Sequence, residues 1–403
     1  MSLAQNWIDR AEQSVMKTYG RYPLVAMRGE GCRLWDVDDK EYLDFLAGVA
    51  VNNLGHCHPK VVAALREQAG MLLHCSNFYQ IPQQIELAEW LCARSFADRV
   101  FFCNSGAEAN EGAMKLARKY SFEKYGDDRY EIITAKASFH GRTLGGISAT
   151  GQEKVQAGFA PMIPGFINVP FGDIDALRAT ITPRTCAIML EPVQGEGGVN
   201  VPPPGYLKAV RALCDDNDLL LIFDEIQVGC GRTGTLWAYQ QEGVEPDVMT
   251  LAKALAGGPP IGALLARQPF AEALGPGTHG STFGGNPLMC SAALAAMHAL
   301  EEDGILENGL AMGNYLRGKL EELCDKYSFV KEVRGRGLIL GMELDCDGGE
   351  IVKQAMQRGL LINCTVGTVL RFVPPLVVTQ TDIDAAIAIL DTVLAEKSES
   401  GGQ

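Results

Sequence analysis

An acid at the end of an apolar run and a lysine among small residues are the groups of this sequence best suited to chemistry. The apolar residues 219–223 deliver Asp224 and Gln227 to the end of a strand-like segment, and Lys253 follows in Leu-Ala-Lys-Ala-Leu-Ala-Gly-Gly. A carboxylate can keep a pyridine ring protonated, and a lysine shielded from water loses proton affinity, which frees its amine to attack an aldehyde. Because pyridoxal 5′-phosphate (PLP) needs both groups, Asp224 and Lys253 predict a PLP site.

Each of these two residues also has an ordinary explanation. Lys253 alone would usually extend into solvent from the protein surface, since most lysines are exposed. Asp224 alone could cap the end of a strand. Each explanation is plausible singly, but the two together are improbable, so the pair favours a cofactor site.

A second motif could bind a phosphate group. Asn104-Ser-Gly-Ala-Glu-Ala-Asn110 follows an apolar run and opens a helical pattern. Ser105, Gly106 and Ala107 would then present free backbone N–H groups where the helix dipole favours an anion. In the alternative, Ser105 and Glu108 form only a capping box, and this motif taken alone favours that simpler interpretation.

Two segments invite a nucleotide-binding interpretation. The strand-like segment ending in Asp224 resembles a Walker B strand, and Gly229-Cys-Gly-Arg-Thr-Gly234 matches G-x-G-x-x-G. A P-loop enzyme also requires G-x-x-x-x-G-K-[ST], which the sequence lacks, and a dinucleotide fold places its glycines directly between strand and helix. Here Asp-Glu-Ile-Gln intervenes, so we interpret residues 229–234 as a loop.

Three further loops contain polar or aromatic residues. Phe139-His-Gly-Arg-Thr143 combines a flat ring with Arg142, although a structural phenylalanine beside a solvated arginine is equally plausible. Residues 280–287, which include Ser281 and Thr282, precede a helical pattern and could be only a turn with a cap. Residues 55–59 contain two histidines two positions apart but no third ligand, which favours a polar turn, so we assign no metal.

Composition limits the classes of function. The chain has 403 residues, of which 47% are hydrophobic, and acids exceed bases by 49 − 35 = 14. This charge would repel nucleic acid over most of the surface. The twelve cysteines include no C-x-x-C pair, which favours reduced thiols. Neither a membrane-spanning run nor a basic leader followed by an apolar core is found, so we expect no membrane partner and a cytoplasmic location.

The hydrophobic pattern predicts an α/β fold with two domains. From about residue 61 to residue 290, helical patterns alternate with brief apolar runs, which favours a mostly parallel sheet covered on both faces. These runs are residues 99–103, 130–134, 185–190, 219–223, 248–251 and 261–266. After an alanine-rich helix that begins near Pro287, residues 291–403 are typical of a smaller α+β domain. Residues 1–60 predict an irregular, partly β segment that joins this smaller domain.

In order and spacing, six motifs resemble the class III PLP-dependent aminotransferases. They are Asn-Ser-Gly-Ala-Glu-Ala-Asn, Phe-His-Gly-Arg-Thr, Glu191-Pro-Val-Gln-Gly-Glu-Gly-Gly, Asp-Glu-Ile-Gln-Val-Gly-Cys-Gly-Arg-Thr-Gly, the lysine segment and Ser-Thr-Phe-Gly-Gly-Asn. The resemblance extends from Gly29 to Leu376, and it implies a fold-type I PLP enzyme. The double proline at residues 259–260 departs from the family pattern, but it alters a loop and no catalytic residue.

The resemblance implies a role for each residue of the cofactor site. Lys253 would bond to the cofactor and then move the proton between the substrate carbon and the cofactor. Asp224 would hold the pyridine nitrogen, and Gln227 the phenolic oxygen. The other expected cofactor contacts are Phe139 on the ring, Ser105, Gly106 and Ala107 at the phosphate, Glu225 and Ile226, and Thr282 from the partner subunit of a homodimer. An active site formed at an interface implies an inactive monomer.

Within the class, the motifs are most similar to members that move the δ-amino group of N²-acetyl-L-ornithine to 2-oxoglutarate in arginine biosynthesis. By this resemblance Arg142 would bind the substrate carboxylate, with Ser281 nearby. Arg371 would bind the α-carboxylate of glutamate. We hypothesise that Glu196 pairs with Arg371 during the acylornithine half-reaction and releases it for glutamate; an ordinary glutamate in a glycine turn is the alternative.

Several alternatives remain at this point. Succinylornithine, ornithine or 4-aminobutyrate could be the amino donor with the same catalytic groups, and a decarboxylase or an aminomutase could share the fold. Arg142 and Arg371 together favour substrates with carboxylates and an external keto-acid acceptor. A catalytically silent binding protein is disfavoured by the retention of Lys253, Asp224 and Gln227. A nucleotide-dependent oxidoreductase is disfavoured by the absent P-loop and by the misplaced G-x-G-x-x-G.

Overall fold

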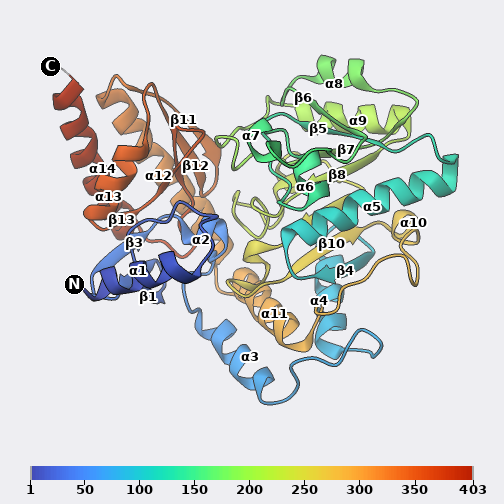
Figure 1. Cartoon of the computed structure of the whole chain (residues 1–403), viewed down its shortest axis with the longest axis horizontal. Helices are drawn as coiled ribbons and strands as arrows, with labels where there is room; N and C mark the ends of the chain where they lie inside the picture. Colours follow the sequence, from blue (N-terminus) through green and yellow to red (C-terminus); the bar gives the residue numbers. More distant parts are fainter. Residues whose placement is uncertain (1, 402–403) are drawn as a thin grey trace.

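The computed structural model of the chain describes residues 2–401 and is built around a seven-stranded central sheet (Figure 1). The strand order is β4-β10-β9-β8-β7-β5-β6, and β10 is antiparallel to both of its neighbours while the β9-β8-β7-β5-β6 pairs are parallel. The strands are β4 (Arg99–Cys103), β5 (Glu131–Ala135), β6 (Phe166–Val169), β7 (Thr185–Leu190), β8 (Leu220–Asp224), β9 (Val248–Leu251) and β10 (Gly262–Ala266). The predicted mostly parallel α/β sheet is therefore confirmed.

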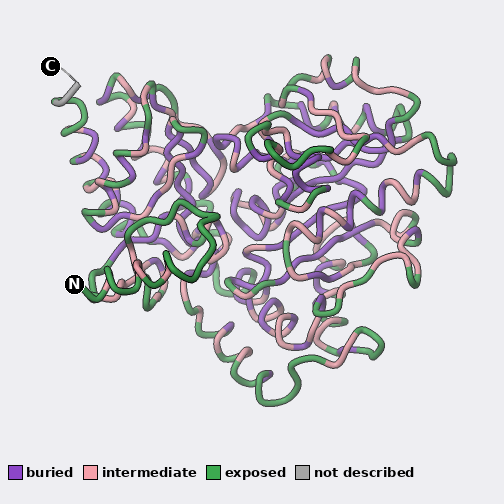
Figure 2. The backbone as a smooth tube through the Cα atoms, in the orientation of Figure 1, coloured by how far each residue is buried: buried purple, intermediate pink, exposed green. Residues whose placement is uncertain are grey.

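Helices cover both faces of the central sheet because its strands are apolar on both sides. In β8, Ile222 belongs to a cluster with α5 (Gly106–Tyr125), whereas Leu221 and Phe223 pack in the larger core with α9 (Tyr206–Asn217). Successive strand residues point to opposite faces, so an unbroken apolar run needs a cover on each. Figure 2 shows this buried interior along the central strands.

Two smaller sheets lie beside the central one. The N-terminal sheet pairs β1 (Ala26–Glu30), β2 (Arg33–Asp36), β3 (Glu41–Asp44) and β13 (Leu360–Leu361) in that order. The C-terminal sheet has the order β11-β12-β15-β14, with β11 (Val330–Arg336), β12 (Ile339–Leu344), β14 (Asn363–Thr365) and β15 (Val369–Phe372). Since β3 pairs in parallel with β13, the N-terminal strands join the C-terminal part of the chain (Figure 1).

The remaining helices connect and cover these sheets. They are α1 (Leu3–Ser14), α2 (Ala47–Ala50), α3 (Pro59–Ala69), α4 (Pro82–Ala93), α6 (Leu144–Ala149), α7 (Glu153–Gln156), α8 (Ile174–Thr180), η1 (Ala238–Gln241), η2 (Lys253–Ala256), α10 (Gln268–Ala271), α11 (Pro287–Glu302), α12 (Ile305–Lys326), α13 (Gly349–Gln357) and α14 (Gln380–Gly401). The predicted alanine-rich helix is α11, capped by Asn286, whose side chain accepts a hydrogen bond from Met289 N–H. None of the helices within residues 2–401 is long and apolar enough to cross a membrane.

Candidate active site

A cavity of about 240 Å³ lies where the central strands end. Asp224 is the last residue of β8, and Lys253 comes two residues after the end of β9. The loops after β5 and β7 reach the same edge, because the carboxyl ends of parallel strands meet there. The residues that line the cavity are Gly106, Ala107, Asn110, Phe139, His140, Gly141, Arg142, Glu191, Glu196, Asp224, Ile226, Gln227 and Lys253.

Asp224 is buried at the floor of this cavity and is held from two sides. Its Oδ2 accepts hydrogen bonds from Asn110 Nδ2 at 2.8 Å and His140 Nδ1 at 2.8 Å, and its Oδ1 accepts one from Ile226 N–H at 3.1 Å. Thr250 Oγ1 in turn donates to Asn110 Oδ1 at 2.7 Å. These bonds fix the carboxylate in one orientation, as a group that must hold a ring nitrogen requires.

His140 is fully buried beside Asp224. Burial lowers the pKa of His140, but the hydrogen bond and the charge of Asp224 outweigh burial, so its pKa is raised overall. A proton on Nδ1 is therefore favoured, and His140 acts as a donor to Asp224. This donor adds to the hydrogen bonds that hold the buried Asp224 carboxylate in place.

Lys253 stands at the start of η2 with a left-handed backbone, at φ 45°. Burial lowers the pKa of Lys253, although the nearby charge of Glu196 opposes this effect. A lysine without its proton is the nucleophile that an aldehyde needs. The backbone strain at this position is of the kind that is found at functional sites.

The N-terminus of α5 opens into the same cavity through Gly106 and Ala107. A Cβ atom at Gly106 would collide with the side chain of Ile226, so only glycine allows this approach. Ser105 caps the helix, because its Oγ accepts a hydrogen bond from Glu108 N–H at 3.3 Å. The N–H groups of the first helical residues have no acceptor within the helix, and they offer donors to an anion.

Glu196, Gln227 and Arg371 form a hydrogen-bonded group at one side of the cavity. Arg371, in β15, donates to Glu196 Oε1 at 2.6 Å and to Gln227 Oε1 at 3.2 Å. Gln227 Nε2 donates to the same Glu196 oxygen at 3.1 Å. Burial raises the pKa of Glu196, but the charges of Arg371 and Lys253 and the hydrogen bonds from Arg371 and Gln227 together outweigh burial, and the pKa of this carboxyl is lowered overall.

Some expected site residues lie outside the cavity. The carboxylate of Glu225 is turned away and accepts hydrogen bonds from the N–H groups of Ala238 at 2.7 Å and Tyr239 at 2.8 Å. Ser281, in the loop before α11, accepts hydrogen bonds from Gly284 N–H and Asn104 Nδ2. Its neighbour Thr282 is exposed. Ser105 caps the N-terminus of α5 and does not line the cavity.

Four lining residues, Asn110, His140, Gly141 and Glu191, were not assigned from the sequence. Asn110 follows Gly106 by one helical turn, so the 3.6-residue period could have placed it on the same face. His140 stands between Phe139 and Arg142 in a motif that was already singled out. Burial raises the pKa of Glu191, whose carboxylate accepts a hydrogen bond from Phe139 N–H at 3.1 Å.

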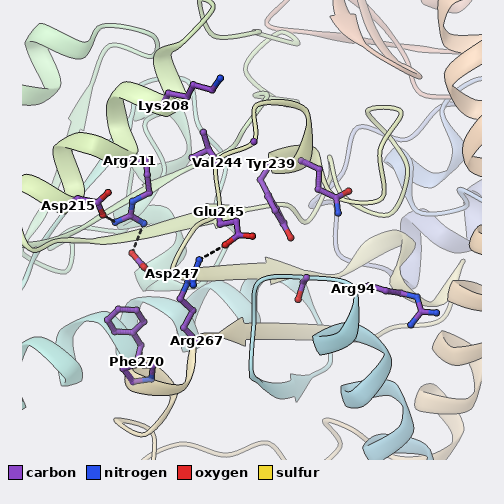
Figure 3. A pocket seen from close by; sticks show the side chains of 14 residues that line it. Arg94, Lys208, Arg211, Asp215, Tyr239, Val244, Glu245, Asp247, Arg267 and Phe270 are labelled. Atoms are coloured by element: carbon purple, nitrogen blue, oxygen red, sulfur yellow. Dashed lines mark hydrogen bonds and ion pairs between the residues drawn. The ribbon is translucent and has the colours of Figure 1, made fainter.

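A larger surface hollow, of about 980 Å³, lies away from these residues (Figure 3). Arg211 pairs there with Asp215 at 2.6 Å and with Asp247 at 2.8 Å, and Arg267 pairs with Glu245 at 2.6 Å. These carboxylates already neutralise the two arginines. Asp247 immediately precedes β9, so this hollow is at the opposite end of that strand from Lys253.

The described residues contain no cluster of three His, Cys, Asp or Glu side chains that could hold a metal ion. In the His-Cys-His segment, His56 Nε2 instead contacts Asp44 Oδ2 at 2.7 Å. The same Asp44 caps the following turn by accepting a hydrogen bond from Ala47 N–H at 2.8 Å. This segment is therefore a polar turn.

A mostly parallel sheet with a buried acid, a desolvated lysine and a helix N-terminus at its carboxyl edge defines a fold-type I PLP-dependent enzyme. The family Aminotransferase class-III matches residues 15–394, and the chain belongs to this family. The resemblance inferred from the motifs is thus confirmed. PLP is the cofactor of this class, and it fits a site with a phosphate cradle at Gly106, a carboxylate at Asp224 and an amine at Lys253.

Individual relatives extend over almost the whole chain. Acetylornithine aminotransferase of Caldanaerobacter subterraneus subsp. tengcongensis is 56% identical over 390 residues, which cover 96% of this chain and 99% of the relative. The protein of the same name from Methanocaldococcus jannaschii is 54% identical, over 97% of this chain and 98% of its own.

Two solved structures have the same fold. Ornithine aminotransferase of Toxoplasma gondii has a TM-score of 0.96 at 37% identity, covering 99% of this chain and 97% of its own. Acetylornithine aminotransferase of Elizabethkingia anophelis has a TM-score of 0.88 at 35% identity, covering 98% of this chain and 100% of its own.

Proposed function

We propose that the chain transfers the δ-amino group of N²-acetyl-L-ornithine to 2-oxoglutarate, giving N-acetyl-L-glutamate 5-semialdehyde and L-glutamate in arginine biosynthesis. The observation that carries this proposal is the pairing of Arg371 with Glu196 beside Lys253. An arginine with a displaceable partner can serve one substrate that presents a carboxylate to it and another whose carboxylate binds elsewhere in the site. The names of the relatives at more than 50% identity support the same reaction.

The asymmetry of this ion pair indicates which partner moves. The side chain of Arg371 is 1% exposed, whereas that of Glu196 is 30% exposed and stands in a glycine-rich loop. Asn363 Oδ1 also accepts a hydrogen bond from Arg371 Nε at 3.2 Å, which fixes the guanidinium. Glu196 therefore swings aside when the α-carboxylate of glutamate arrives, and it covers Arg371 when acetylornithine presents its distal amine.

The substrate carboxylate of acetylornithine would meet Arg142. This arginine is exposed at the mouth of the cavity, with its guanidinium 5.4 Å from the centroid of the Phe139 ring. Phe139 is then placed to stack on the cofactor ring, with Ser281 of the adjoining loop as a further polar contact. Arg142 and Arg371 would thus hold carboxylates at two different places in one site.

Bound PLP supplies an electron sink that makes the substrate carbon acidic. The chain itself supplies the proton transfers and the orientation. Lys253, with its lowered pKa, takes the proton from the substrate carbon and delivers it to the cofactor. Asp224 holds the ring nitrogen, and the second N–H of Gln227 Nε2 is available to the phenolic oxygen while the first binds Glu196.

A second copy of the chain would complete the site. Exposed aromatic side chains lie on and beside the Ser281 loop. Phe283 is 60% exposed, and its ring is 5.4 Å from that of His74. The segment of His74 is joined to the loop, because Asn77 Nδ2 donates to the carbonyl of Ser281 at 3.1 Å. The neighbouring Phe78 is 93% exposed. A patch of this kind marks an interface, and the exposed Thr282, next to Phe283, would bind the partner's cofactor phosphate.

The remaining proposals concern organisation and location. A large domain of residues 61–290 would hold the cofactor, and residues 1–60 with 291–403 would form the small domain. The β3–β13 pairing supports this division, although α11 runs across residue 290. A cytoplasmic location would suit an enzyme of amino-acid biosynthesis.

The test is the visible absorbance of the purified, PLP-loaded protein during addition of N²-acetylornithine. Ornithine, succinylornithine and 4-aminobutyrate are added separately for comparison. Preferential loss of the cofactor band with acetylornithine, reversed by 2-oxoglutarate, supports the proposal. Preference for another amine would keep the chemistry and change the substrate, whereas the absence of any cofactor band would remove the role given to Lys253.

A further inference from the structure

The loop Gly229-Cys-Gly-Arg-Thr-Gly234 is a joint between the central and C-terminal sheets. Gly231, at φ 85°, lies so close to Leu376 and Leu306 that a Cβ atom would collide with both side chains. A Cβ atom at Gly337, between β11 and β12, would collide with the backbone at Thr233. Gly337 therefore lets its backbone meet that of the loop, and Gly231 leaves room for leucine side chains, so close packing accounts for these glycines without a nucleotide site.

Arg232, within this loop, is 0% exposed and binds three other segments of the chain. Its NH1 donates to the carbonyl of Leu338 at 2.8 Å and to that of Pro374 at 2.5 Å, while its NH2 donates to Asn53 Oδ1. In return, Leu338 N–H donates to the Arg232 carbonyl at 3.0 Å. The guanidinium thus connects the loop after β8 to the C-terminal sheet and to the segment before α3.

This guanidinium is a buried charge held by neutral oxygens. Among the residues that the structure describes, no carboxylate forms an ion pair with it. Burial lowers the pKa of Arg232 to about 9, which leaves the group charged at neutral pH. Burying a charge without a counter-ion is unfavourable, so its retention needs a compensating role.

The acceptors of Arg232 stand at one end of the strand pair that holds Arg371. Leu338 immediately precedes β12, and Pro374 comes two residues after the end of β15. Gly341 of β12 is the register partner of Arg371 in β15. The guanidinium of Arg232 therefore holds both strands at points three residues from Arg371 and from its register partner. It holds them against a loop that begins two residues after Gln227.

We propose that Arg232 is a positioning residue for dicarboxylate binding: it holds β12 and β15 so that Arg371 faces Glu196 and Gln227. The inference rests on the proposed function, because that function gives Arg371 the carboxylate of glutamate. The cofactor groups Asp224 and Lys253 belong to the central sheet and do not depend on this joint. Loss of Arg232 should therefore weaken dicarboxylate binding and leave cofactor binding intact.

The chain offers a matched control at another link between the same two parts. Arg336, in β11, pairs with Glu242 at 2.6 Å, next to η1, and this pair is only partly buried. Partly exposed ion pairs contribute little to the placement of the elements they join. Arg336→Gln should therefore leave the position of Arg371 unchanged.

The test uses PLP-loaded protein and glutarate, a five-carbon dicarboxylate that has neither an amine nor a keto group to react. Arg232→Lys is expected to weaken glutarate binding about tenfold, the equivalent of one charge-assisted hydrogen bond, with the visible cofactor band and PLP affinity unchanged. Asn53→Ala, which removes one acceptor, should weaken it about threefold on the same scale. Arg336→Gln should change it by less than about twofold.

Hydrogen exchange supplies a readout that needs no ligand. The backbone amides of β12 and β15 should exchange faster in Arg232→Lys, and those of β8 should not. Normal exchange in β12 and β15 together with unchanged glutarate affinity would overturn the inference. Faster exchange in β8 together with loss of the cofactor band would also overturn it, because Arg232 would then support the whole fold.

Arg371→Lys separates this inference from the function on which it rests. If Arg371→Lys weakens glutarate binding but Arg232→Lys does not, the positioning role is wrong and the proposed function stands. If Arg371→Lys leaves glutarate binding unchanged, the dicarboxylate role of Arg371 is wrong. The exchange of β12 and β15 then still decides whether Arg232 forms the joint.

Discussion

Glu196→Gln is the substitution that tests how one site serves two amino donors. It keeps the shape of the side chain and an oxygen that can accept from Arg371, but it removes the negative charge. The 2.6 Å contact with a guanidinium that is 1% exposed makes this charge the one that glutamate must displace. The variant should therefore bind dicarboxylates more tightly and process acetylornithine more slowly.

The size of the effect follows from the kind of hydrogen bond that is changed. A bond between two charged groups contributes about 1.5–3 kcal/mol, whereas a bond between an arginine and a neutral amide contributes about 1 kcal/mol less. Displacing the neutral amide of the variant from Arg371 is then easier than displacing the Glu196 carboxylate by about 1 kcal/mol, or roughly fivefold in affinity for 2-oxoglutarate. The acetylornithine half-reaction should slow by a similar factor, because the charge of Arg371 is no longer covered.

Rapid mixing measures the two half-reactions separately through the visible absorbance of the cofactor. Loaded enzyme is mixed with acetylornithine in one experiment, and aminated enzyme is mixed with 2-oxoglutarate in the other. The exposed Glu153, in the first turn of α7, provides the control variant Glu153→Gln, which should behave as the parent does. Unchanged rates in both half-reactions of Glu196→Gln, or an equal loss in both, would refute the switching role.

Three further predictions address the cofactor, the fold and the interface. Asp224→Asn should lower kcat by at least about 100-fold and shift the cofactor absorbance, because the ring nitrogen loses its counter-charge; an unchanged spectrum would contradict this. Burial raises the pKa of Glu225 to about 8, above its usual 4.5, so the folded chain holds a proton that the unfolded chain releases between these values. The free energy of unfolding should then fall as pH rises from 4.5 to 8, and Glu225→Gln should flatten this pH dependence in thermal unfolding. The same pH dependence of stability in both proteins would assign the effect to another group. Phe78→Asp should yield monomers in sedimentation velocity with more than about tenfold lower activity, since a charge is placed in an apolar interface; an active monomer would disprove the shared site.

The convergence of the candidate cofactor residues could be predicted from the sequence because backbone topology alone brings most of them together. Apolar runs that alternate with helices predict parallel strands, and parallel strands bring Asp224 and Lys253 to one edge. Side-chain direction does not follow from this pattern. Glu225 follows Asp224 directly, yet strand alternation turns its carboxylate to the opposite side, toward the N–H groups of Ala238 and Tyr239.

Short and half-buried elements left weaker signals. The strand β6 has only four residues and contains Asn168, so it lacks the unbroken apolar run that identified its neighbours. The helix α1 buries none of its residues, so it adds nothing to the core from which the domains were predicted. Asn110 and His140 converge on Asp224 from α5 and from the loop after β5, and such a convergence depends on tertiary packing.

The two kinds of binding in this site come from different parts of the fold. The central sheet, its loops and the N-terminus of α5 supply the residues of one chain that are proposed to hold the cofactor, whereas Arg371 comes from the C-terminal sheet. Glu196, on the loop after β7 of the central sheet, accepts a hydrogen bond from Arg371 NH1 of the C-terminal sheet at 2.6 Å. A small change in the relative position of the two sheets would therefore alter dicarboxylate affinity before it altered the cofactor chemistry. Substitutions at the joint around Arg232 should for this reason change KM for 2-oxoglutarate more than they change the visible spectrum.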